Sequence, residues 1–314
     1  MHKTPWGSPA RRLGLLTLSA WTALLLTLSA CDVAVTTGQD DSQRPSAGSG
    51  RRAHADRGER RHLSDSQALA LYAPAHQKPG LAACPEHFPA GLPLDLAQVA
   101  PDWRPTGLCS ENFAVVHSGL TKTPLLVVER LDAALMRDAR DETRTDQFYA
   151  DPRLPPKERA ELGDYKGSGF DRGHMAPAAD QPTPSAMAQS FALSNMVPQD
   201  RINNQRIWAK VESDVRKYVR RAKGDVYVFS GPLFDASPET MGRQRVWIPT
   251  RLFKLVYDAS EQRAWAYILD NRADTRVEAP VPYERFVQQT GWKVLADVPV
   301  NGTISGRRLD DLSR

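Results

Sequence analysis

Asp171-Arg-Gly-His-Met-Ala-Pro177 is the stretch of sequence around which the chain is organised. It follows a glycine-rich approach over residues 163–169, so it can enter the fold as a short extended strand. That strand would deliver His174, the only histidine in the second half of the chain, to a site. Gly173 lacks a side chain and would allow a substrate or a metal to come close to the backbone.

A helix is expected after this strand, because apolar residues recur at helical spacing on one side of it: Trp208, Val211, Val215 and Val219. At about 100° of rotation per residue, Asn204 and Glu212 stand two turns apart at the edge of that apolar face. Both side chains can then point into one cleft. Trp208 is expected in the core rather than as a stacking platform for bases, and His117, inside a strand pattern, is expected to be structural.

An imidazole, an amide oxygen and a carboxylate together suit phosphodiester hydrolysis. A neutral imidazole has a pKa near working pH and can take the proton of an attacking water. A hard divalent cation neutralises the phosphate and the departing oxygen, and Mg²⁺ accepts one or two protein oxygens while keeping most of its waters. Simpler roles stay open: Asn204 can cap the helix, and Glu212 can pair with Arg216 four residues on.

Three spaced motifs carry a resemblance to a known family: Asp171–Pro177, Ser194-Asn-Met-Val-Pro-Gln199, and Asn204-Gln-Arg-Ile-Trp208 with Glu212. Together they resemble the DNA/RNA non-specific endonuclease family, from about Phe113 to Asn271. The resemblance implies an α+β domain with the ββα-metal nuclease fold, a central and largely antiparallel sheet with flanking helices. It also implies hydrolysis of DNA and RNA to products with 5′-phosphates.

The resemblance assigns the central chemistry to three residues. His174 is the general base, and Asn204 is the direct ligand of a Mg²⁺ that is otherwise held by waters. Glu212 hydrogen-bonds one of the metal-bound waters. Mn²⁺ is the alternative ion. The oligomeric state stays open, with a homodimer as one alternative.

Four further residues receive supporting roles from the resemblance. Arg172 and Asn195 help to position or stabilise the site, and Asp171 orients the motif. The family also uses an upstream arginine, for which Arg144 is the candidate.

Cations gather on the expected helix. Residues 1–62 carry the whole net charge of +4, so residues 63–314 are neutral, but Arg201 to Lys223 hold eight Arg or Lys and two acids. Arg206 and Lys210 are the candidates for binding the phosphates of DNA and RNA substrates. The alternative is that this basic surface is only solvated.

The N-terminus is expected to direct export. Residues 1–12 are basic, and the apolar run Leu13–Leu28 is short for a membrane span, which needs about 20 residues. The run ends in Leu28-Ser-Ala-Cys31, which resembles the lipobox of bacterial lipoproteins, in which Cys31 is lipidated. A membrane-anchored lipoprotein facing the periplasm or the cell exterior is expected, and an ordinary cleaved signal peptide is the alternative.

Composition divides the chain into a signal peptide over residues 1–30, a flexible tether over residues 31–64 and a folded domain over residues 65–314. The tether has almost no large apolar residue, so it cannot offset the entropy of ordering. Cys84 and Cys109 are the two cysteines of the folded part, and in an exported protein they are expected to pair. Two buried free thiols are the alternative.

Strand and helix patterns surround the motif. Residues 113–118 and 124–129 predict one β-hairpin, residues 225–230 a strand, and residues 251–257 and 263–269 a second hairpin. Helical structure is expected over residues 157–162 and 282–290. Two other functions stay open: a nucleic-acid-binding lipoprotein without cleavage, and a hydrolase of another phosphodiester such as a lipid headgroup.

Overall fold

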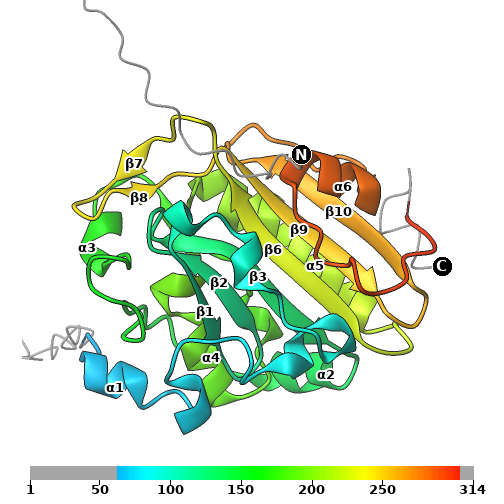
Figure 1. Cartoon of the computed structure of the whole chain (residues 1–314), viewed down its shortest axis with the longest axis horizontal. Helices are drawn as coiled ribbons and strands as arrows, with labels where there is room; N and C mark the ends of the chain where they lie inside the picture. The colour runs from blue at the N-terminus through cyan, green and yellow to red at the C-terminus, as the bar shows by residue number, and fades with distance from the viewer. Residues whose placement is uncertain (1–61, 305–314) are drawn as a thin grey trace, which may run out of the picture. The chain divides into compact units, whose positions relative to one another are not determined.

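A seven-stranded antiparallel sheet forms the centre of the computed structural model, which describes residues 62–304 (Figure 1). Its order is β1-β2-β3-β6-β9-β10-β11. The strands are β1 (Pro105–Cys109), β2 (Ala114–Ser118), β3 (Thr123–Leu131), β6 (Val226–Leu233), β9 (Arg251–Asp258), β10 (Arg263–Asp270) and β11 (Val281–Pro282). The expected α+β class and both expected hairpins are confirmed.

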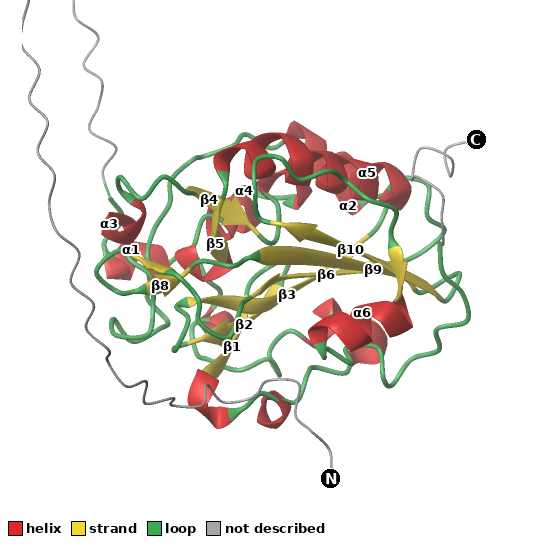
Figure 2. Ribbon diagram, turned by 90° about the horizontal axis from the view of Figure 1, so that it is seen from above, coloured by secondary structure: helices red, strands yellow, loops and turns green. Residues whose placement is uncertain are grey.

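Helices cover both faces of this sheet (Figure 2). One face carries α2 (Leu135–Asp138), α4 (Pro184–Ser190) and α5 (Ala209–Val219), and the other carries α6 (Tyr283–Thr290) together with N-terminal 3₁₀ turns. Alternate strand residues serve the two layers, because successive side chains of a strand point to opposite faces. Val226 and Val228 pack in the core with α5, whereas Tyr227 and Phe229 pack in the core with α6.

Three polar residues interrupt the core on the α5 face, at neighbouring places on three central strands. Ser230 of β6 is paired with Lys254 of β9 on one side and with Val127 of β3 on the other. Glu129 lies two residues after Val127, so its side chain points to the same face of the sheet. Each of the three polar residues is about 1% exposed. The Nζ atom of Lys254 donates a hydrogen bond to the Oγ atom of Ser230 at 2.6 Å. The sheet therefore has a buried row of polar and charged side chains on the face that α5 covers.

Two short strand pairs lie outside the main sheet. One joins β4 (Asp171–His174) to β5 (Met196–Gln199), and the other joins β7 (Thr240–Met241) to β8 (Val246–Trp247). The first pair holds the motif around which the sequence is organised, because β4 ends at His174.

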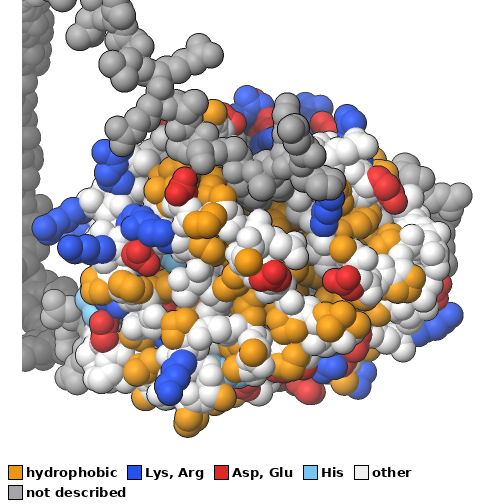
Figure 3. All heavy atoms as spheres, viewed as in Figure 1, with side chains coloured by type: hydrophobic (Ala, Val, Ile, Leu, Met, Phe, Trp, Pro, Cys, Tyr) orange, Lys and Arg blue, Asp and Glu red, His pale blue; other side chains and the backbone are white. Residues whose placement is uncertain are grey.

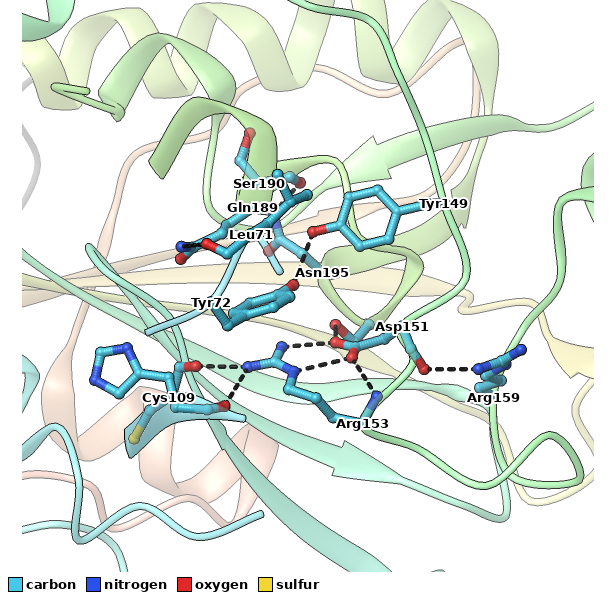
Figure 4. Close-up of polar contacts among 12 residues, drawn as sticks. Leu71, Tyr72, Cys109, Tyr149, Asp151, Arg153, Arg159, Gln189, Ser190 and Asn195 are labelled. Carbon is cyan, nitrogen blue, oxygen red and sulfur yellow. Dashed lines mark hydrogen bonds and ion pairs between the residues drawn. The ribbon is translucent and has the colours of Figure 1, made fainter. Parts of the chain in front are cut away.

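A buried ion pair and a disulfide attach the N-terminal segment to the sheet. Cys84 and Cys109 form the expected disulfide. The side chains of Asp151 and Arg153 are fully buried, with 2.6 Å between their charged atoms (Figure 4). The Arg153 guanidinium lies 3.7 Å from the ring centroid of Tyr72 and donates to the Cys109 carbonyl. Arg153 thus joins the N-terminal segment, the edge strand and the loop before the motif.

The structure departs from two expectations. The helical turn expected over residues 157–162 lies later, in α3 (Leu162–Tyr165), because Glu161 and Asp164 cap its first turn. The strands β1 and β5 and the helix α4 were not expected. Helix α6 is confirmed, and the first described helix is α1 (Asp65–Leu69).

The expected signal peptide, Cys31 and the tether up to residue 61 lie outside the described residues. Within residues 62–304, no helix is both long enough and apolar enough to span a membrane.

Candidate active site

His174 lies in an aromatic pocket at the end of β4. Its ring meets Phe191 edge to face, with centroids 5.0 Å apart, and Phe148 lies 5.9 Å away. The histidine is 9% exposed, and its Nε2 atom has no hydrogen-bond partner among the described residues. Burial, with a smaller effect from the Arg144 charge, lowers the pKa of His174 to about 3. The imidazole is therefore neutral at ordinary pH and has a free nitrogen.

Two arginines border this pocket, each against one of its aromatic rings. The Arg144 guanidinium lies 5.0 Å from the Phe191 centroid, and the Arg172 guanidinium lies 4.3 Å from the Phe148 centroid. Arg144 is exposed and paired with Asp146 at 2.6 Å. Both predicted arginines thus lie beside the histidine, where a phosphate anion would meet positive charge.

Asn195 stabilises the backbone of the motif through hydrogen bonds. It is fully buried, and its Oδ1 atom accepts from the Ala176 amide at 2.9 Å. Its Nδ2 atom donates to the carbonyls of Ala176 and Ser190, and Asn195 lies near Ser190 in Figure 4. Because its amide group is used by backbone partners, Asn195 acts by fixing the segment that follows His174.

Gly173 serves a different purpose from the expected one. A Cβ atom at this position would overlap the Gln199 side chain, which crosses over from β5. The close approach that glycine permits here is therefore made by a side chain of the neighbouring strand.

Asn204 lies in a π-helical turn, Asn203–Trp208, directly before α5. The expectation of regular rotation from Asn204 to Glu212 is therefore wrong, because a π turn advances fewer degrees per residue than an α-helix. The Asn204 Nδ2 atom donates to the Asp171 carboxylate at 3.0 Å. Gln205 donates to the same oxygen at 2.8 Å, and Arg201 pairs with the other at 3.6 Å. Asp171 thus orients the Asn204 amide from the strand that carries His174.

Glu212 faces a cluster of buried charges. It is half-buried, and burial raises its pKa to about 7 although Lys254 and Arg216 act in the opposite direction. Arg216 pairs with Asp180 at 3.0 Å instead of forming the simple pair with Glu212 that the spacing allowed. Near pH 7 the Glu212 carboxyl group therefore changes its charge readily.

Sequence reasoning missed three members of this cluster, Glu129, Asp180 and Lys254. Glu129 and Lys254 each stand at an inward position of an apolar strand, in Leu125-Leu-Val-Val-Glu129 and in Leu252-Phe-Lys-Leu-Val256. A charged residue at such a position is rarely buried without a partner, and this is the signal that would have identified them. Burial raises the pKa of Glu129, Asp180 adds to this effect, and Lys254 opposes it.

The structure joins the predicted residues through shared neighbours. Within residues 62–304, no hydrogen bond links His174 to Asn204 or to Glu212. Asp171 connects Asn204 to the strand of His174, and the Arg144 charge acts on both His174 and Glu212. Lys254 donates to the Met175 carbonyl at 3.4 Å, directly after the histidine.

The residues present fit a hard cation with few protein ligands. The Asn204 Nδ2 atom is bound to Asp171, and the described residues give its Oδ1 atom no hydrogen-bond partner, so this oxygen is available. Oxygen is the ligand that Mg²⁺ and Mn²⁺ prefer. Residues 62–304 contain no group of three or more His, Cys, Asp or Glu that could hold a metal, so the fit rests on this amide oxygen.

Two clefts flank the histidine pocket. One, of about 600 Å³, is lined by Phe148, Tyr165, Lys166 and Arg172 among others, and a second, of about 310 Å³, is lined by Arg144 and further arginines. The predicted phosphate-binding residues differ in their surroundings, because Lys210 pairs with Asp214 at 2.6 Å while Arg206 is exposed.

Figure 3 shows how the cations are distributed on one face of the molecule. There, Lys and Arg side chains gather mainly near the β7–β8 hairpin and are otherwise scattered among acidic and hydrophobic ones.

Comparison with known proteins identifies relatives of this chain. Residues 100–301 match the model of the DNA/RNA non-specific endonuclease family. Nuclease EXOG, mitochondrial, of Homo sapiens is 36% identical over 160 residues, which cover 47% of this chain and 43% of that protein. Endonuclease G, mitochondrial, of Bos taurus is 31% identical over 222 residues, covering 66% of this chain and 73% of that protein.

The fold of this chain is also similar to that of a solved structure. A solved structure of EndoG, from its complex with EndoGI, superposes with a TM-score of 0.58 at 25% identity and covers 65% of this chain and 91% of that one. This confirms the expected ββα-metal fold. The chain spans about half the length of the first curated relatives that it matches. Because the family model matches more than half of this chain, the chain belongs to the DNA/RNA non-specific endonuclease family.

Proposed function

We propose that the chain is an endonuclease that hydrolyses internal phosphodiester bonds of DNA and RNA, with His174 as the general base. The observation that carries the proposal is the neutral, buried His174 imidazole, whose Nε2 atom has no partner in residues 62–304. It lies between two clefts that carry arginines on their walls.

His174 becomes a stronger base when a phosphate binds. In the structure, burial and the Arg144 charge both favour the neutral ring. A phosphodiester anion next to the ring opposes the effect of Arg144 and stabilises the imidazolium, so the pKa of His174 rises toward the working pH. The ring then takes the proton of a water that attacks the phosphorus. The bond between the phosphorus and the 3′-oxygen breaks, the 3′-oxygen leaves and takes up a proton from solvent, and the product carries a 5′-phosphate.

A Mg²⁺ ion, with Mn²⁺ as a substitute, would be held by the Oδ1 atom of Asn204 and would supply Lewis-acid stabilisation of the charge that develops on the phosphate. Asp171 keeps that oxygen directed away from the strand by accepting from the Nδ2 atom. Glu212, when ionised, would accept a hydrogen bond from a water molecule held by that ion. Arg144 and Arg172 neutralise the phosphate.

Cleavage of supercoiled plasmid DNA and of a long RNA tests this proposal. We expect nicked and then linear DNA, degraded RNA, loss of both activities in EDTA, and a loss of at least about 100-fold in His174→Ala. His117→Gln is the matched control, since His117 is buried in β2 and bonded to the Glu158 carbonyl. If the protein binds DNA but cuts neither substrate, it is a binding protein; if it cuts only a small diester, it acts on another substrate.

We also propose that the chain is exported and anchored to a membrane through a lipidated Cys31. The Cys84–Cys109 disulfide supports export, because disulfides persist in oxidising compartments. Metabolic labelling with a radioactive fatty acid should mark the wild-type chain and leave Cys31→Ala unlabelled. Label on the variant, or none on the wild type, contradicts the anchor.

A further inference from the structure

An arginine-rich cleft is lined by residues of α2, α4 and α5 among others. These three helices lie on one face of the sheet (Figure 2). The cleft has a volume of about 310 Å³. Four arginines line it, against one acid, Glu142: Arg140, Arg144, Arg216 and Arg220. They come from two separate segments. Arg140 lies in the turn after α2 and Arg144 follows that turn, whereas Arg216 and Arg220 lie at the end of α5. Two distant parts of the chain thus converge to make one positive surface.

Ion pairing separates these arginines into two kinds. Arg216 is paired with Asp180 at 3.0 Å, and Arg144 is paired with Asp146 at 2.6 Å. Arg140 and Arg220 are exposed, and neither makes an ion pair within residues 62–304. Their charges are therefore available to a ligand, and a cleft with a net positive charge concentrates anionic ligands.

The cleft adjoins the surroundings of His174 through Arg144. This residue lines the cleft, and its guanidinium also contacts Phe191, whose ring packs against His174. An anion bound by Arg140 and Arg220 would therefore extend from the reacting centre along the end of α5. A long polyanion fits such a path better than a small phosphodiester, which would occupy only the position beside His174.

A second cleft with arginines shows that cations alone do not make such a surface. It has about 400 Å³ and is lined by Arg251, Arg272 and Arg276, but also by Asp270, Asp274 and Glu278. Arg272 pairs with Asp270 at 3.2 Å and with Asp274 at 3.5 Å. Its charges are balanced, so it has no comparable attraction for a polyanion.

We propose that Arg140 and Arg220 bind a backbone phosphate of the nucleic-acid strand away from the bond that is cleaved, and so guide the strand to His174. This inference rests on the proposed endonuclease function and names the interactions that would distinguish a polymeric substrate from a small diester. It places the phosphate-binding residues at the end of α5 and in the turn after α2.

The test compares two double variants that remove the same charge, Arg140→Ala/Arg220→Ala and Arg272→Ala/Arg276→Ala. Binding of a 30-base-pair DNA is measured against salt in a His174→Ala background of the full chain, and plasmid and bis(4-nitrophenyl) phosphate hydrolysis is measured with His174 present. We expect the first pair to reduce the salt slope by about 0.9 for each phosphate that the variant no longer neutralises. Plasmid kcat/KM should fall on the order of ten-fold, whereas hydrolysis of the small diester should be unchanged.

The control pair should leave all three measurements as in the parent protein. A charge-conserving pair, Arg140→Lys/Arg220→Lys, should retain the salt slope, which separates loss of charge from loss of folding. Equal salt slopes in the two alanine pairs overturn the proposal. The proposal is also overturned if Arg140→Ala/Arg220→Ala loses small-diester hydrolysis to the same extent as plasmid cleavage. If the parent protein cleaves neither substrate but the slopes differ as expected, the strand-binding proposal stands and the endonuclease proposal fails.

Discussion

The ammonium group of Lys254 lies 5.3 Å from the ring centroid of Trp208, so a buried cation on the central sheet faces the indole at the start of α5. The same ammonium donates to the Ser230 hydroxyl and to the Met175 carbonyl. Lys254 therefore contacts the sheet, the segment after His174 and the helix segment that carries Asn204. Its charge also lowers the pKa of Glu212 against the effect of burial.

Lys254→Met should lower both stability and activity. Removal of the cation leaves the buried Glu129 and the half-buried Glu212 with less compensating charge, and breaking such a buried cluster costs about 3 kcal/mol. Urea unfolding and nuclease assays measure the two effects. Lys293→Met, at an exposed lysine, is the matched control and should change the stability by less than about 0.5 kcal/mol.

The pH dependence of the Lys254 variant separates an electrostatic effect from mere loss of packing. Without the Lys254 charge the pKa of Glu212 rises further, so the acid limb of kcat/KM should move to higher pH. An unmoved limb in a folded Lys254→Met protein would show that Lys254 does not control the Glu212 charge.

Asp171→Asn should weaken metal binding. The Asp171 carboxylate accepts from the Nδ2 atom of Asn204 at 3.0 Å and fixes the direction of the opposite amide oxygen. Loss of an outer partner of a metal ligand typically costs about 10- to 100-fold in affinity. The half-saturating Mg²⁺ concentration for plasmid cleavage should therefore rise by this factor, with little change in rate at saturation. Asp274→Asn, at an exposed carboxylate, is the control, and equal Mg²⁺ requirements in the two variants would contradict the role of Asp171.

The sequence predicts the central strands of the fold well because their signals are local. Residues 113–129 and 251–269 alternate or run apolar between turn residues, and both hairpins form as expected. Strand β1 has no such pattern, and its place depends on distant packing: a side chain at Gly107 would overlap Leu81 of the N-terminal segment. Strand β5 contains Pro198, which breaks a strand pattern although the residue pairs with Arg172.

The sequence motif names candidate residues for the site, but it does not predict their geometry. The motif identifies His174 and Asn204, yet the π turn depends on Asn203, which donates to the Asp270 carbonyl and accepts from Gln199. Asp270 is distant in sequence and Gln199 precedes the helix, so the apolar spacing that begins at Trp208 cannot reveal either partner. The contacts of Lys254 could not be predicted either, because they depend on strands that are distant in sequence and lie side by side.

Burial of His174 should make stability depend on pH. Its pKa is lowered to about 3 in the folded state against about 6.5 when unfolded. The unfolded chain therefore binds the proton first as pH falls, and the contribution of His174, complete above pH 6.5, is lost progressively toward pH 3. The stability difference between wild type and His174→Ala should shrink by roughly 3 kcal/mol from pH 7 to pH 4.

Urea unfolding of both proteins across this range provides the measurement. Burial also lowers the pKa of His117, to about 4, so both proteins lose stability on acidification, and only their difference reports His174. Parallel curves for the two proteins would mean that the His174 ring is already accessible to protons in the folded state.

Arg153→Met should destabilise the whole N-terminal attachment shown in Figure 4. Burial alone would raise the pKa of Asp151, but Arg153 and the hydroxyl of Ser194 hold it below its usual value. Without Arg153 that fully buried carboxylate is uncompensated, which costs about 3–5 kcal/mol. Arg104→Met, in a partly exposed pair with Glu158, should cost at most about 1 kcal/mol.

Protonation should partly relieve the Arg153→Met defect. In the wild type the lowered pKa of Asp151 gives stability that is present above pH 4 and lost as pH falls through the folded pKa. In the variant, Asp151 becomes neutral at higher pH, because burial then acts without opposition from the guanidinium. The stability gap between the two proteins should therefore narrow as pH falls from 7 to 4, as measured by urea unfolding. A gap that stays constant would mean that the loss comes from packing against Tyr72 and not from the ion pair.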